Sequence, residues 1–78
     1  MEVKVGNTVK KLRTVEFAVY SAIKNLIESE DIYCVHVKGI WGECDGLSLA
    51  QVKGAIGSLV VKGAIAEVEP NHYEHLSV

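Results

Sequence analysis

Hydrophobic positions repeat with a helical period over two long stretches of the chain. Between Thr14 and about Ser29, apolar residues recur at steps of three and four, which places them on one face of a helix. We predict a helix there with Thr14 as its N-cap, because a threonine hydroxyl accepts a hydrogen bond from a free amide of the first turn. The predicted buried stripe contains Val15, Val19, Ala22, Ile23, Leu26 and Ile27.

A second helix is predicted over Ser48–Lys62, where several signals agree. Ser48 and Gln51 have the spacing of a capping box, in which each side chain accepts a hydrogen bond from a backbone amide at the start of the helix. Gly63 follows the last turn, as is common where a helix ends. The stripe expected to face the core contains Leu49, Val52, Ile56, Leu59 and Val60.

The segment between these helices, Asp31–Gly46, supports two local structures. Residues 32–35 include β-branched and aromatic side chains, which are typical of a short strand. The next apolar residues then fall at i, i+3, i+4 and i+7, which predicts a short helix that ends at Asp45-Gly46 and holds Trp41 in the core. That stripe consists of Val37, Ile40, Trp41 and Cys44. The sequence leaves open whether residues 32–45 form a strand, a helix or both.

After Gly63 the hydrophobic period changes from 3.6 to 2. Apolar and polar residues alternate over Ala64–Glu69 and again over His72–Val78. Pro70-Asn71 lies between the two runs and is a turn signal. This pattern predicts a β-hairpin directly after the second long helix.

The first 13 residues also have two interpretations. Valines at positions 3 and 5 alternate with charged residues, as in a short strand, and Gly6-Asn7 then interrupts the pattern. A basic arm fits this segment equally well. We therefore expect an arm or short strand at residues 1–13 and one domain at residues 14–78.

Composition places the chain among small globular proteins. Its 78 residues suffice for one domain, and with 49% hydrophobic and 23% charged residues it does not have the composition of a disordered chain. No apolar stretch approaches the roughly 18 to 20 residues of a membrane span, and residues 1–13 lack the apolar block of a signal peptide. We expect a cytoplasmic protein without membrane contact, in which Cys34 and Cys44 are thiols.

Charge is distributed unevenly along the chain. Residues 1–27 carry five basic and two acidic side chains, a net charge of +3, whereas residues 28–78 carry three basic and eight acidic side chains, a net charge of −5. Any contact with nucleic acid must therefore depend largely on the N-terminal third of the chain.

The order of the predicted elements resembles that of the winged helix–turn–helix superfamily. The segment Gly46–Ile65, with its small turn, serine cap, leucine–valine pair and Lys62-Gly63 ending, is similar to the recognition-helix segment of that superfamily. The resemblance covers about residues 14–78 and is specific only over residues 46–68. It implies an α+β fold, a three-helix winged helix–turn–helix with a C-terminal two- or three-stranded antiparallel β-hairpin wing. A small regulatory or phage-type domain would have this size.

The resemblance also implies binding to double-stranded DNA and a role in transcription regulation. Residues 48–62 would enter the major groove as the recognition helix, and the hairpin tip would approach the backbone. The candidate DNA-binding residues are Lys10, Lys11, Arg13, Ala50, Gln51, Lys53, Gly54, Ser58, Lys62, Asn71 and His72. Three acidic residues of the wing, Glu67, Glu69 and Glu74, would repel phosphates, so we expect weak and steeply salt-dependent binding.

The same helix face supports a different kind of partner. When the helix is projected at 100° per residue, the face opposite the core is formed by Ala50, Gln51, Gly54, Ala55, Ser58, Val61 and Lys62. The small residues on this side of the helix are Ala50, Gly54, Ala55, Gly57 and Ser58, and Val61 adds an apolar group. A smooth face of this kind suits a protein partner or a homodimer without DNA binding. A plain solvated surface is a third interpretation of the same residues.

Chemical sites are not indicated by the sequence. The cysteines and histidines at positions 34, 36, 44, 72 and 75 lack the close paired spacing of structural zinc sites. No Ser–His–acid pattern and no glycine-rich phosphate loop is present. We therefore predict a binding module without metal, cofactor or catalytic activity.

Overall fold

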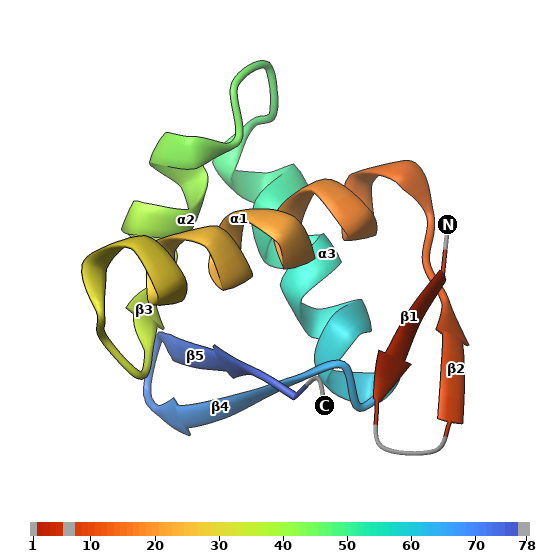
Figure 1. The fold of residues 1–78 in the computed structure, drawn as a ribbon. Helices are drawn as coiled ribbons and strands as arrows, with labels where there is room; N and C mark the ends of the chain where they lie inside the picture. Colours follow the sequence, from red (N-terminus) through yellow and green to blue (C-terminus); the bar gives the residue numbers. More distant parts are fainter. Residues whose placement is uncertain (1, 6–7, 77–78) are drawn as a thin grey trace.

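The computed structural model describes residues 2–5 and 8–76 and contains three helices and two small sheets within them (Figure 1). In chain order the elements are β1 (Glu2–Val5), β2 (Thr8–Lys11), α1 (Thr14–Glu30), β3 (Val35–His36), α2 (Val37–Glu43), α3 (Leu49–Val61), β4 (Ile65–Glu69) and β5 (His72–His75). The α+β class predicted from the sequence is confirmed. The turn at Gly6-Asn7 and the tail at Ser77-Val78 lie outside the described residues.

The N-cap of helix α1 lies one residue earlier in the chain than the sequence predicted. Arg13 is the N-cap, with an extended backbone, and Thr14 is already the first helical residue, so the prediction of Thr14 as the cap is wrong. The carboxylate of Glu16 accepts a hydrogen bond from the Arg13 backbone N–H at 2.7 Å. An arginine side chain has no acceptor, and the glutamate therefore supplies the cap. The helix ends at Asp31, whose φ of 53° is left-handed.

Helix α3 confirms the strongest prediction from the sequence. Ser48 is its N-cap, and its hydroxyl accepts from the Gln51 backbone N–H at 3.1 Å. The Gln51 side-chain oxygen accepts from the Ser48 backbone N–H at 2.8 Å, which completes the capping box. Lys62 is the C-cap, and Gly63 follows with a φ of 76°, a conformation that glycine adopts without strain.

The segment between α1 and α3 contains both a strand and a helix. The strand is limited to Val35–His36, and Ile32 and Tyr33 lie before it, exposed. Helix α2 ends at Glu43 and not at Asp45-Gly46. Trp41 was predicted in the core, but 43% of it is exposed, and its indole N–H donates to the Leu47 carbonyl at 3.0 Å.

The C-terminal hairpin belongs to a three-stranded antiparallel sheet with the order β3-β5-β4. Strand β4 starts at Ile65 and pairs with β5, with a register shift between Glu67 and Glu69. The two-residue turn has Asn71 at a φ of 66°, which asparagine tolerates better than most residues. The N-terminal strands β1 and β2 form a separate two-stranded antiparallel sheet.

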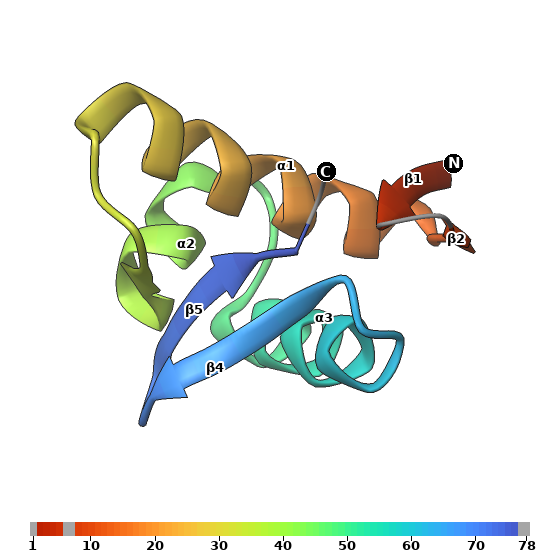
Figure 2. The same cartoon turned by 60° about the horizontal axis from the view of Figure 1, so that its bottom comes forward.

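The core lies between the three helices and one face of the three-stranded sheet. Figure 2 shows α3 beside β4 and α1 above β5. The largest fully buried side chains come from all of these parts: Val19, Ile23, Ile40, Val52, Leu59 and Ile65. Besides Trp41, two predicted core residues are exposed, Val15 by 36% and Val60 by 39%, whereas Tyr20, which lies outside the predicted stripe, is buried.

Within the described ranges, no helix has both the length and the apolar character needed to cross a membrane.

Candidate interaction surface on helix α3

Two grooves run along the two sides of α3. The first, the α1–α3 groove, has a volume of about 450 Å³ and is lined by Arg13, Thr14 and Glu16 from the start of α1 and by Gln51, Gly54 and Ser58 from α3. The second, the α3–hairpin groove, has a volume of about 360 Å³ and lies between α3 and the β4–β5 hairpin. Its lining includes Val37, Lys53, Ile56, Gly57, Glu67 and Tyr73.

A buried carboxylate lies at the first groove. Only 4% of Glu16 is exposed. Lys62 donates from Nζ to Glu16 Oε1 at 2.6 Å, and the Ser58 hydroxyl donates to Oε2. Lys62 also donates to the Lys11 carbonyl at 3.2 Å. These contacts join the end of β2, the start of α1 and the C-terminal half of α3.

The hydrogen bonds around Glu16 decide its protonation state. Burial raises the pKa of this carboxyl, but the Arg13 backbone N–H, the Lys62 ammonium and the Ser58 hydroxyl together lower it from 4.5 to about 2. Glu16 is therefore ionised at neutral pH, and its charge is balanced by that of Lys62.

Three of the predicted DNA-binding side chains make hydrogen bonds within the domain. Gln51 belongs to the capping box, and Ser58 and Lys62 both donate to Glu16. The helix projection was also wrong for Ala55, which is buried, because the start of α1 packs against that side of α3.

The hairpin tip, predicted to approach DNA, is held against the rest of the domain. The Asn71 carbonyl accepts from the Val37 backbone N–H at 2.9 Å, and the Asn71 N–H donates to Glu67 at 3.1 Å. The His72 ring packs edge-to-face on His36, with 5.0 Å between ring centroids. Asn71 and His72 therefore have structural contacts at the start of α2.

The remaining predicted residues surround the outer face of α3. Ala50, Lys53 and Gly54 are exposed on the helix itself. Arg13 lines the α1–α3 groove, and Lys10 and Lys11 lie on β2, which reaches the C-terminal end of α3 through Lys62.

The outer face of α3 consists of Ala50, Gly54, Gly57 and Val61. Their spacing of four, three and four residues places them on one side of the helix, and all are exposed, Val61 by 88%. Lys53 is the only charged residue within the helix. A Cβ atom built at Gly54 or Gly57 would meet no atom within 4 Å. The packing of the described chain therefore does not require glycine at either position.

Gly57, one of the small residues predicted for the face opposite the core, is exposed on it. Glu16, at the α1–α3 groove, was not identified from the sequence as a site residue. Its partners Ser58 and Lys62 are 42 and 46 residues away, and a contact at that separation leaves no local pattern.

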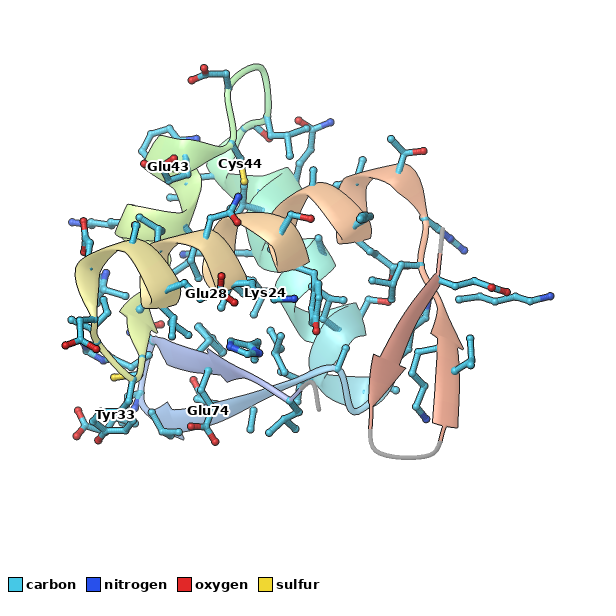
Figure 3. All side chains as sticks on the ribbon, in the orientation of Figure 1. Lys24, Glu28, Tyr33, Glu43, Cys44 and Glu74 are labelled. Carbon is cyan, nitrogen blue, oxygen red and sulfur yellow. The ribbon has the colours of Figure 1, made fainter. Side chains whose placement is uncertain are left out.

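Other reactive side chains lie away from α3. Cys44 follows Glu43 at the end of α2 (Figure 3), and its pKa is raised by burial and by the charges of Glu43 and Asp45. Cys34 and Cys44 are both free thiols. Across residues 2–5 and 8–76, no three His, Cys, Asp or Glu side chains are grouped to hold a metal ion.

Comparisons of the chain with protein-family models, with curated proteins and with solved structures found no match.

Proposed function

We propose that this chain is a non-catalytic winged-helix binding module that contacts a protein partner through the outer face of α3. The winged-helix assignment is supported by the order of the elements. The short helix α2 precedes α3, and β3, between α1 and α2, joins the hairpin to make a three-stranded wing.

The chemistry of the outer face carries the choice of a protein partner. The face offers two glycines, an alanine and a highly exposed valine, with Lys53 as the only charge in the helix. Readout of bases requires side chains that donate or accept hydrogen bonds in the major groove. Gln51 and Ser58, the side chains suited to that role, already have internal partners. An apolar face depleted of charge is typical of the centre of a protein interface.

The two glycines strengthen this argument. Glycine inside a helix is less favourable than alanine by about 1 kcal/mol, and the space around Gly54 and Gly57 would accept a methyl group. A benefit that balances this cost must come from outside the described chain. The close approach of a partner's backbone or side chains to a helix supplies such a benefit, since any Cβ would hold the partner away.

DNA binding stays a second candidate because cations surround the same face. Arg13 and Lys11 are exposed beside α3, and Lys53 lies on it. The three lysine and arginine charges would give weak, salt-dependent phosphate contacts. This candidate uses the flanks of the outer face, whereas the protein candidate uses its apolar centre.

Photo-crosslinking inside the cells that express this chain tests the proposed contact with a protein partner. A photoreactive residue at position 61 is expected to give one discrete protein adduct, and the same residue at the exposed position 28 of α1 serves as the control. Adding Gly54→Leu should abolish the adduct, whereas Gly54→Ala should weaken it less and leave the fold intact. Equal adduct formation at positions 61 and 28 would contradict the proposal.

Titration with random-sequence duplex tests the second candidate. Binding at about 50 mM salt that is lost at about 200 mM salt, and that is weakened by Lys53→Glu, would favour DNA. Val61→Lys separates the two candidates, because an added charge disrupts an apolar protein contact but strengthens phosphate binding.

A further inference from the structure

The structure leaves sheet edges of opposite charge unpaired. Strand β4 forms one edge of the sheet with order β3-β5-β4, the other being the two-residue strand β3, and β1 and β2 each have one free edge in their two-stranded sheet. In the part of the chain that the structure describes, no further strand pairs with these edges. A free edge presents a row of backbone N–H and C=O groups to which another strand can bind.

The charges of the two edges are complementary. Strand β4 contains Glu67 and Glu69, both exposed, and no basic residue. Strand β2 contains Lys10, which is half-buried, and Lys11, which is exposed, and no acidic residue. Pairing β4 with β4, or β2 with β2, would bring like charges together, whereas pairing β2 with β4 brings opposite charges together.

The N-terminal ribbon has the properties of an element that needs a partner. A two-stranded ribbon is marginally stable in water by itself. Figure 1 shows β1 and β2 beside the start of α1 and the end of α3, apart from the three-stranded sheet. Lys62 holds the Lys11 carbonyl, but Val9, an apolar residue of β2, is 57% exposed.

We propose that β2 of one copy of this chain pairs with the outer edge of β4 of a second copy. The contact uses two different surfaces, so it is head-to-tail and leaves one free edge of each kind at the two ends of a dimer. The register shift between Glu67 and Glu69 shortens the regular ladder on β4, and we expect a short contact that depends strongly on charge. The inference does not depend on the outer face of α3.

Sedimentation velocity from micromolar to millimolar concentration tests the proposal. The chain is expected to associate at about 0.02 M salt, with a dissociation constant roughly tenfold higher at about 0.5 M salt, because screening weakens contacts between exposed charges. Glu69→Lys and the double variant Lys10→Glu/Lys11→Glu should each associate less by themselves. A mixture of these two variants should regain association, since each supplies the charge that the other lacks.

Two controls separate edge pairing from other contacts. Glu30→Lys makes the same charge change at the exposed end of α1, away from both edges, and should associate like the unmodified chain. Val61→Lys changes the outer face of α3 and should also have no effect, so failure of the α3 proposal and failure of this one are distinguishable. Hydrogen exchange should show protection of the β4 amides on association.

Three results would overturn the edge contact. The first is a strict monomer at millimolar concentration and low salt. The second is equal weakening by Glu30→Lys and Glu69→Lys. The third is association that Val61→Lys abolishes and that the edge variants leave unchanged, which would assign self-contact to α3.

Discussion

Replacing Glu16 by glutamine should destabilise the fold through loss of charge. The carboxyl pKa falls from 4.5 to about 2 on folding. At about 1.4 kcal/mol for each tenfold change in affinity for the proton, this shift corresponds to about 3 kcal/mol at neutral pH. A third of the Lys62 side chain is exposed, and water screens that part of the interaction. We therefore expect Glu16→Gln to lower the free energy of unfolding by about 2 kcal/mol.

The effect should depend on pH in a defined direction. The folded-state pKa of Glu16 lies below that of the unfolded chain, so the unfolded state binds the proton first as pH falls. The stabilisation is complete above about pH 5.5 and is lost as pH falls from about 5 toward 2. The difference between the original chain and Glu16→Gln should therefore narrow over that range.

Urea unfolding followed by the fluorescence of Trp41, at about pH 7 and about pH 3, measures this difference. Glu28→Gln, a substitution of an exposed glutamate on the same helix, is the matched control and should change stability by less than about 0.5 kcal/mol. If Glu16→Gln costs the same free energy at both pH values, the loss comes from packing or neutral hydrogen bonding, and the charge argument is refuted.

Three further predictions concern caps, thiols and the tryptophan. Ser48→Ala should lower the free energy of unfolding by about 1 kcal/mol through loss of the α3 cap. Urea unfolding measures the change, with Ser29→Ala at an exposed position as the control. Equal losses of stability in the two variants would contradict the cap. Cys44 should react with iodoacetamide at mildly alkaline pH more slowly than Cys34, because burial and acidic neighbours raise the pKa of Cys44. Unfolding in urea should remove this difference in rate. Equal rates in the folded protein, measured by mass spectrometry, would contradict the prediction. Acrylamide should quench Trp41 in the folded state, since 43% of the residue is exposed, whereas a shielded tryptophan would restore the core assignment.

Local signals identified most of the elements. The capping box of Ser48 and Gln51 and the glycine at position 63 bounded α3 to within one residue, because these interactions span no more than four residues. The change of period after Gly63 identified the hairpin for the same reason. Arg13 gave no such signal, since the α1 cap is made by the residue three positions later.

The short elements were harder to place because pairing defines them. Strand β3 is two residues long and exists as a strand through Val35 and His36 pairing with β5, more than thirty-five residues away. Apolar content around Ile32 and Tyr33 favoured a longer strand, but those residues have no partner strand among the described residues.

For the candidate surface, too, the sequence determined one part and the tertiary structure the other. The sequence determined that α3 carries small residues and one charge, because composition and helical spacing are properties of the segment itself. Which of its sides faces water was decided when the start of α1 packed against Ala55 and Ser58 and when Lys62 bound Glu16. Caps and periodicity act over a few residues and can be read along the chain. Burial and ion pairing depend on which segments meet in space, and the tertiary structure alone fixes that.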